Sequence, residues 1–168
     1  MEPAERVVIE RVTAADTHAI RREVLRSHAP ELGVDTPADD NPAAVHLAAS
    51  LGGEIIGVVS VAPSEDPLAG GPGSWRLSGM AVRAPWQSHG VGSALIDRLV
   101  EEVTARRGRL VWAQARDTAL AFYERHGFRV LGEAFEHAHL PHHAVVRELQ
   151  LGRRDSVVHL SAARRPPT

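Results

Sequence analysis

The segment Gln87-Ser88-His89-Gly90-Val91-Gly92 is the part of the chain best suited to bind an anion. An apolar helical repeat begins at Val91, and the start of a helix carries unpaired backbone N–H groups and the positive end of the helix dipole. No acidic residue lies between Ser88 and Ile96, and the two glycines leave those N–H groups uncovered. The pattern predicts a phosphate-binding turn. The alternative is that the glycines only shape a tight turn between a strand and a helix.

Four histidines form the second group that could do chemistry: His137, His139, His142 and His143. In an extended segment His137 and His139 share a face, as two zinc ligands would. However, Pro141 interrupts the run and Glu136 is the only acid close to it. We therefore expect a solvated turn or the wall of a pocket and predict no metal site.

The elements that position these groups follow from apolar periodicity and turn residues. Strands are predicted at residues 7–12, 45–51, 54–62, 75–82, 109–115, 128–136 and 144–151. Helices are predicted at 16–26, from Val91 to the Arg106-Arg107-Gly108 stop, and from Asp117, as the cap, to His126. Residues 27–42 and 63–73 are expected to be loops.

This order of elements indicates a mixed sheet of the α/β class. Gly52 and Gly53 between two apolar runs predict an antiparallel hairpin. A strand at 75–82, a helix and a strand at 109–115 form a crossover unit, which makes those two strands parallel. The last two strands are predicted to be an antiparallel pair. We expect one domain at residues 1–152 and a tail at 153–168.

Three segments together resemble the GNAT superfamily, the acetyl-CoA-dependent N-acetyltransferases. The order Gln87-Ser88-His89-Gly90-Val91-Gly92 is similar to the family's Gln/Arg-x-x-Gly-x-Gly/Ala pyrophosphate loop. The strand end Met80-Ala81-Val82 and the later Ala121-Phe122-Tyr123-Glu124-Arg125-His126-Gly127-Phe128 also look like that family. The resemblance spans about residues 7 to 151.

The resemblance implies a mostly antiparallel sheet with one parallel crossover pair and helices on both faces, whose fourth and fifth strands splay apart around the pantetheine of CoA. The family often has Asn seven residues before the Tyr, where this chain has Arg116, with Gln114 two residues earlier. Arg116 could reach the cofactor or could simply be solvated. The residues that the resemblance places at the cofactor are Met80, Ala81, Val82, Gln87, Ser88, His89, Gly90, Val91, Gly92, Ser93, Arg116 and Phe122.

The resemblance assigns Tyr123, the only tyrosine, to catalysis as the donor of a proton to the departing thiolate. A phenol with a pKa of about 10 can protonate a thiolate as charge develops on sulfur. The alternative is an aromatic ring that packs beside Phe122. The backbone amide near Ala81 is the expected donor to the oxyanion.

The general base is left unassigned. Residues 75–82 contain no acid, so the glutamate that the family often has there is missing. Ser78, His89, Glu136, the histidine group or a chain of waters remain as alternatives.

The composition excludes several other classes of protein. The 168 residues include 19 basic residues, all of them Arg, 21 acidic residues and no Cys or Lys. Thiol nucleophiles, cysteine zinc sites, Walker lysines and Schiff-base lysines are therefore excluded. The formal charge of −2 gives no basic face for nucleic acid. With no leader and no apolar span, we expect a cytoplasmic protein with no membrane partner.

The expected function is transfer of an acetyl group from acetyl-CoA to an amine of a small molecule or protein, by direct attack in a ternary complex. The alternatives are a regulatory module of the same fold that binds CoA or acyl-CoA without turnover, and a structural protein in which the glycine turn is only a turn. The acceptor is left open and depends on the expected loops at residues 27–42, 63–73 and 137–143. The tail could reach a second copy in a homodimer.

Overall fold

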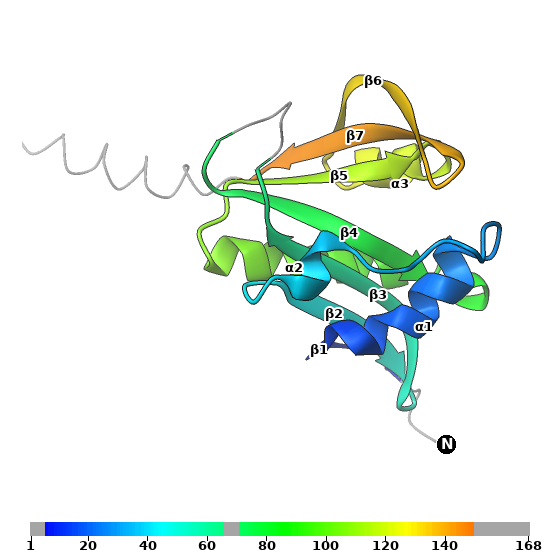
Figure 1. Cartoon of the computed structure of the whole chain (residues 1–168). Coiled ribbons are helices and arrows are strands. Elements are labelled where there is room, and N and C mark those ends of the chain that lie inside the picture. Colours follow the sequence, from blue (N-terminus) through cyan, green and yellow to red (C-terminus); the bar gives the residue numbers. More distant parts are fainter. Residues whose placement is uncertain (1–5, 66–70, 150–168) are drawn as a thin grey trace, which may run out of the picture.

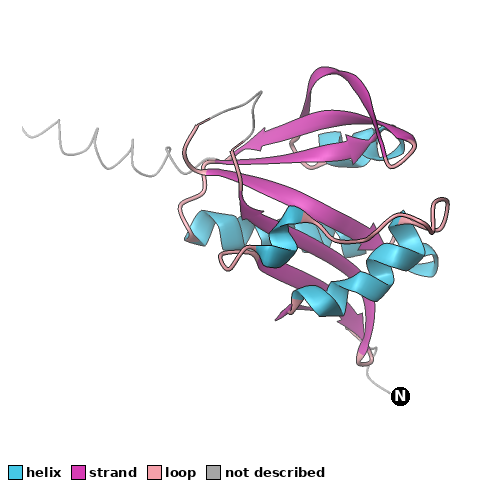
Figure 2. Cartoon of the chain, in the orientation of Figure 1, coloured by secondary structure: helices cyan, strands magenta, loops and turns pink. Residues whose placement is uncertain are grey.

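A computed structural model describes residues 6–65 and 71–149 of the chain. A single seven-stranded sheet has the strand order β1-β2-β3-β4-β5-β7-β6 (Figures 1 and 2). The strands are β1 (Val8–Val12), β2 (Val45–Leu51), β3 (Glu54–Pro63), β4 (Ser74–Val82), β5 (Leu110–Arg116), β6 (Arg129–His137) and β7 (Leu140–Glu148). The helices are α1 (Ala14–Leu25), α2 (Val91–Ala105) and α3 (Leu120–Arg125), with short 3₁₀ turns at Pro37–Asp40, Ala84–Trp86 and Asp117–Ala119.

Helices α1 and α2 cover opposite faces of the sheet (Figure 1). Alternate residues of each strand face one helix or the other, since successive side chains on a strand point to opposite faces. Val59 of β3 belongs to the large core under α2, whereas its neighbour Val58 packs in the smaller core under α1. The α2 stripe is buried as its periodicity predicted, and its buried residues are Val91, Leu95, Ile96, Leu99 and Val103.

The predicted hairpin and crossover are both present. Gly52 and Gly53 have positive φ and join β2 to β3 in an antiparallel pair. Strands β4 and β5 are the one parallel pair of the sheet. Thr13 caps α1 by accepting a hydrogen bond from the Asp16 backbone N–H, so this helix begins two residues earlier than expected.

Strands β4 and β5 lie together only at their starts. Pairing covers Ser74 with Leu110, Trp75 with Val111 and Arg76 with Trp112, after which the two strands diverge (Figure 1). From Leu77 to Val82, β4 therefore has no strand partner on its β5 side within the described residues. This divergence is the splay that the family resemblance implied.

A bulge bends β4 within the divergent part. Ser60 pairs with Ser78 and Val58 with Ala81, so β4 contains one residue more than β3 between these pairs. Gly79 has a φ of +62° there, and a Cβ at this position would lie 2.5 Å from the Arg21 Nε atom. Only glycine fits this position without displacement of the buried Arg21 side chain.

Two expectations about the C-terminal half were wrong. Asp117 does not cap a helix, because a 3₁₀ turn precedes α3 and the Asp117 carboxylate instead lies 2.6 Å from His143 Nδ1. The segment 137–143 is not a loop, because β6 and β7 meet in a two-residue turn at Ala138 and His139. Both turn residues have positive φ, which a search for glycine or asparagine turns does not find.

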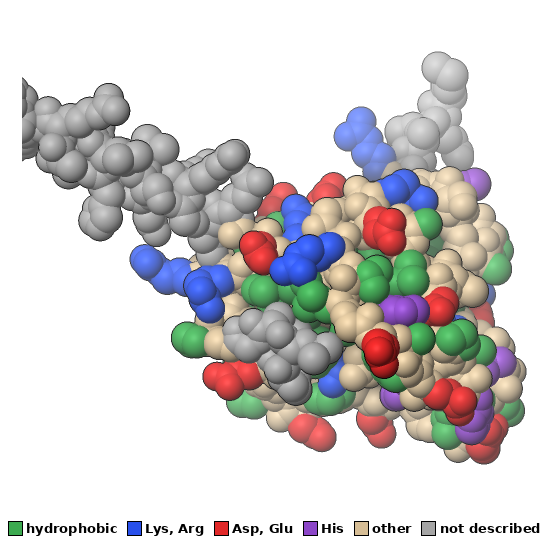
Figure 3. Space-filling model, turned by 90° about the horizontal axis from the view of Figure 1, so that it is seen from above, with side chains coloured by type: hydrophobic (Ala, Val, Ile, Leu, Met, Phe, Trp, Pro, Cys, Tyr) green, Lys and Arg blue, Asp and Glu red, His purple; other side chains and the backbone are tan. Residues whose placement is uncertain are grey.

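The predicted tail at 153–168 lies outside the described residues. No helix within residues 6–65 and 71–149 has the length and apolar character needed to cross a membrane. The face shown in Figure 3 has acidic, basic and histidine side chains interspersed over it.

Candidate active site

A cavity of about 280 Å³ lies where β4 and β5 diverge. Its floor is formed by the two strands, and its walls by the C-terminal end of α1, the loop at residues 34–37 and α3. Of the residues that the family resemblance places at the cofactor or in catalysis, four line this cavity: Met80, Arg116, Phe122 and Tyr123. Side chains far apart in the sequence are therefore brought to one place by the splay of the sheet.

The start of α2 has the features predicted for an anion site. Gly90 has a φ of +82° and precedes the helix, no acid lies in the first turn, and a Cβ on Gly90 would meet nothing within 4 Å. Ser88 also has positive φ, and Gln87 donates from Nε2 to the Val82 carbonyl at 2.8 Å. This bond ties the turn to the end of β4.

Gly92 connects the helix start to the cavity. A Cβ at this position would lie 3.1 Å from the Phe122 ring and 3.3 Å from the Met80 methyl group. Gly92 thus has a packing role of its own, as the alternative interpretation of the glycines requires. Ser93, one residue on, lies 3.1 Å from His126 Nε2 through its hydroxyl group.

Tyr123 is buried against two aromatic rings and still reaches the cavity. Its ring is 5% exposed and makes edge contacts with Phe122 and Phe128, at centroid distances of 5.4 and 5.3 Å. Burial raises the pKa of the Tyr123 phenol well above its usual value. The group therefore stays protonated over the physiological pH range, as a proton donor must.

The structure separates the alternatives for a general base by position. Ser78, His137 and His142 line the cavity, whereas His89 and Glu136 are exposed and do not. The Ser78 hydroxyl is buried with no hydrogen-bond partner in the described part of the chain. The histidine run is therefore partly a pocket wall, which was one of the two expectations for it.

His142 is held in one tautomer. Its Nδ1 atom lies 2.8 Å from the Leu140 carbonyl, which can only accept, so Nδ1 carries the proton and Nε2 is free to accept. Burial lowers the pKa of His142, and the charge of Arg116 adds to this, although the hydrogen bond to the Leu140 carbonyl acts in the opposite direction. The His137 ring packs edge-on against it at 5.2 Å.

Arg116 lies on the α1 face of the sheet, away from the start of α2. Alternation along β5 places Val111, Ala113 and Ala115 in the core under α2, so Arg116 points to the other face. There it donates to the Leu25 carbonyl at the end of α1. Arg116 therefore lies on the face opposite the glycine turn at residues 87–92.

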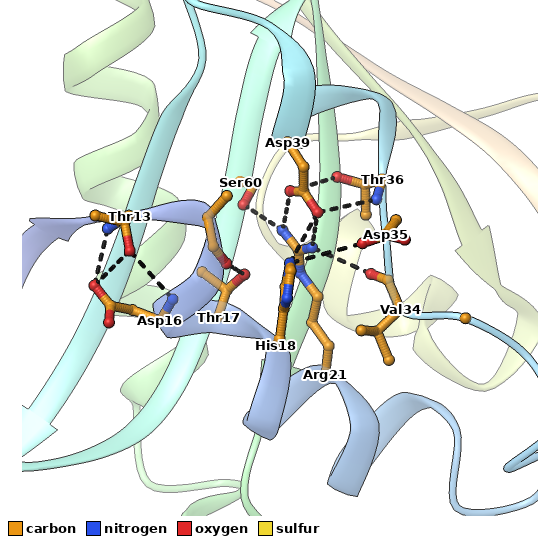
Figure 4. Close-up of polar contacts among 12 residues, drawn as sticks. Thr13, Asp16, Thr17, His18, Arg21, Val34, Asp35, Thr36, Asp39 and Ser60 are labelled. Carbon is orange, nitrogen blue, oxygen red and sulfur yellow. Dashed lines mark hydrogen bonds and ion pairs between the residues drawn. The ribbon is translucent and has the colours of Figure 1, made fainter.

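A buried ion pair, which the sequence did not reveal, anchors the wall of the cavity (Figure 4). Arg21 is 1% exposed and donates to both carboxylate oxygens of Asp39, at 2.8 and 3.0 Å. It also donates to Ser60 of β3 and to the Val34 carbonyl of the loop. One side chain of α1 thereby joins the helix, the sheet and the 34–37 segment.

The same carboxylate is within reach of His18, and ligand atoms of His18, Asp35 and Asp39 lie within 4.8 Å of one another. This geometry is compatible with a metal ion. However, Asp39 is already neutralised by the Arg21 guanidinium, and Asp35 is 86% exposed. The ion pair accounts for the cluster without a metal.

Comparisons with known proteins agree with this geometry. The chain is 27% identical to the "Uncharacterized N-acetyltransferase YitI" of Bacillus subtilis over 138 residues, which cover 82% of this chain and 93% of that protein. Escherichia coli ElaA superposes with a TM-score of 0.71 at 18% identity, over 85% of this chain and 100% of that one.

Two further solved structures share the fold. An acyl-CoA N-acyltransferase of Pseudomonas aeruginosa has a TM-score of 0.67 at 19% identity, over 84% of this chain and 99% of that one. An aminoglycoside 6′-N-acetyltransferase complexed with coenzyme A has a TM-score of 0.63 at 16% identity, over 84% and 96% of the two chains. The sequence profile of the acetyltransferase (GNAT) family matches residues 14–128. The chain belongs to the acetyltransferase (GNAT) family.

Proposed function

We propose that the protein transfers an acetyl group from acetyl-CoA to an amine of a small molecule or protein, by direct attack in a ternary complex. One observation carries the proposal. The unpaired edge of β4 runs between an acid-free helix start and the buried phenol of Tyr123. A donor with a pyrophosphate at one end and a thioester at the other matches this order of groups.

The backbone of β4 supports acetyl-CoA as the donor. Backbone N–H and C=O groups that lose a strand partner need another partner. Met80, Ala81 and Val82 offer such groups to the amides of pantetheine, and the backbone from Gln87 to Ser93 offers N–H groups to phosphate. The aminoglycoside 6′-N-acetyltransferase, which has a related fold, is complexed with coenzyme A.

Each step of the proposed acetyl transfer can be assigned to a group at the cavity. The amide near Ala81, next to the bulge, is placed to stabilise the developing oxyanion. We assign to Tyr123 the donation of a proton to the departing thiolate, since burial raises the pKa of the phenol and keeps it protonated, and the same burial would raise the pKa of a thiol beside it. We assign the role of receiving the proton of the amine, directly or through water, to the Nε2 atom of His142.

Charge at Gly92 tests the anion site. Gly92→Glu and Gly92→Gln place a side chain of the same size against Phe122, so packing changes equally in both. Only the glutamate adds a negative charge beside phosphate, and such a repulsion is worth about 1–4 kcal/mol at 4 Å. We expect calorimetry to show at least about fivefold weaker acetyl-CoA binding for Gly92→Glu than for Gly92→Gln. Equal affinity of the two variants for acetyl-CoA would show that the pyrophosphate does not bind at this turn.

Release of free thiol from acetyl-CoA tests the function. A panel of primary amines is incubated with the protein and acetyl-CoA, and the thiol is followed with a chromogenic disulfide. We expect thiol release that depends on one class of amine. Tight acetyl-CoA binding with no release across the panel would favour the regulatory module that binds without turnover.

A further inference from the structure

Three arginines converge on the cavity from three different elements. Arg76 comes from β4, Arg116 from the end of β5 and Arg26 from the residue that ends α1, and all three line the cavity. Trp75 and Leu77 belong to the core under α2, so the alternate residue Arg76 points to the α1 face, as Arg116 does. The three guanidinium groups therefore share one face of the sheet.

None of these arginines has a carboxylate partner in the described part of the chain. The Arg76 guanidinium lies 5.0 Å over the Trp112 ring, and its Nε atom is buried with no hydrogen bond. Arg116 and Arg26 donate only to backbone carbonyls, both of them to that of Leu25. By contrast, Arg21 in the same wall is neutralised by Asp39.

The cavity is therefore positive. Asp35 is the one carboxylate among its lining residues, and its side chain is 86% exposed. Burial lowers the pKa of both Arg76 and Arg116, since both cations are partly removed from water. The pKa of His137 is lowered first by burial and then by electrostatic repulsion from His142 and from the three arginines.

The position of these charges separates them from the expected cofactor site. The start of α2 lies on the opposite face of the sheet, and its pyrophosphate turn uses backbone N–H groups. A ligand that meets Arg76, Arg116 and Arg26 therefore enters from the α1 face, where an acceptor has access. The volume of about 280 Å³ suits a molecule of the size of an amino acid.

We propose that the acceptor is a small amine that also carries an oxyanion, a carboxylate or a phosphate, held by Arg76 and Arg116. This inference rests on the proposed acetyl transfer. The planar fork of arginine donates two parallel hydrogen bonds to a carboxylate or phosphate, which is the geometry that favours arginine in such sites. The unpartnered Ser78 hydroxyl on the same face can add a third donor. The anion fixes the acceptor while its amine points toward the thioester.

Matched acceptors test the proposal. Amino acids are compared with their carboxamides and decarboxylated amines, and aminoalkyl phosphates with the corresponding amino alcohols, in the thiol-release assay. We expect kcat/KM for the anionic member to be at least about tenfold higher, since hydrogen bonds to charged groups are worth about 1.5–3 kcal/mol. The amino acid series tests whether the anion is a carboxylate, and the aminoalkyl phosphate series tests whether it is a phosphate. Turnover of neutral amines that equals or exceeds that of their anionic partners would overturn the inference and leave the proposed function standing.

Variants connect the selectivity to the arginines. Arg76→Gln should lower kcat/KM for the anionic acceptor by about tenfold or more, and by a much larger factor than it lowers kcat/KM for the neutral partner. Arg129→Gln removes the same charge from an exposed position, 61% exposed and paired with Glu148, and should change neither. Equal losses for both acceptors in Arg76→Gln would show a structural role and contradict the proposal.

A binding measurement keeps the inference testable without turnover. Saturation-transfer NMR measures binding of the N-acetylated amino acids and their neutral carboxamides to the wild type and to Arg76→Gln in the presence of CoA. Selective binding of the anion that Arg76→Gln abolishes would support the inference even if no amine released thiol, which is the result that would defeat the proposed function. Binding without preference for the anion would overturn the inference.

Discussion

Asp39→Ala is expected to lower the free energy of unfolding by about 3–5 kcal/mol, the usual effect of removing one partner of a buried ion pair. Arg21 is 1% exposed and Asp39 is 8% exposed, so the variant leaves a buried cation without a carboxylate to neutralise it. Asp40→Ala, at the exposed neighbouring position, is the matched control and should change stability by less than about 0.5 kcal/mol. Urea unfolding of the three proteins measures the effect.

The Arg21–Asp39 ion pair also predicts how the free energy of unfolding depends on pH. Although burial raises the pKa of Asp39, the hydrogen bonds and charge of Arg21 outweigh burial and lower it to about 2. In the unfolded chain the carboxyl has a pKa of about 3.9. Its contribution is therefore fully present above about pH 4 and is lost as the pH falls toward 2. Two results would show that the ion pair does not anchor the fold. The free energy of unfolding of Asp39→Ala could equal that of the wild type, or it could fall as steeply with decreasing pH as that of the wild type.

Tyr123→Phe is expected to reduce kcat by roughly 10²-fold or more, the usual contribution of a general acid. The variant keeps the ring that packs against Phe122 and Phe128 and removes only the hydroxyl group. Stability and the affinity for acetyl-CoA should therefore stay close to those of the wild type. Steady-state kinetics and calorimetry on the same preparations separate the two properties.

Full activity of Tyr123→Phe across the pH range would show that the ring serves packing alone. In that case the proton for the thiolate would come from water or from His142. If the affinity for acetyl-CoA and kcat both fall, the hydroxyl group instead positions the cofactor. Only a fall in kcat at unchanged affinity supports the proton donor.

The sequence predicted the scaffold well because local patterns determine it. The period of the α2 stripe, the two glycines between β2 and β3 and the parallel crossover all follow from neighbouring residues. The sequence also linked the glycine turn with the segment around Tyr123. In the structure these two regions lie together, through Gly92 and Phe122.

The acceptor side could not be predicted in the same way. Arg21 and Asp39 are 18 residues apart on a helix and in a loop, and Arg76, Arg116 and Arg26 meet only because the sheet splays. An arginine in a strand is usually solvated, so the residue type alone does not predict that it lines a pocket. One signal was present: Arg76 and Arg116 alternate with buried apolar residues, which places both on the face away from α2.

The transfer of the acetyl carbon itself tests the central claim most directly. The wild-type protein is incubated with acetyl-CoA labelled with ¹³C at the acetyl carbonyl and with the acceptor that releases most thiol, and NMR follows the label. We predict that the carbonyl signal moves from thioester to amide, with one free thiol formed for each amide. A thioester that persists with every amine, or a label that appears only as free acetate, would contradict acetyl transfer to an amine.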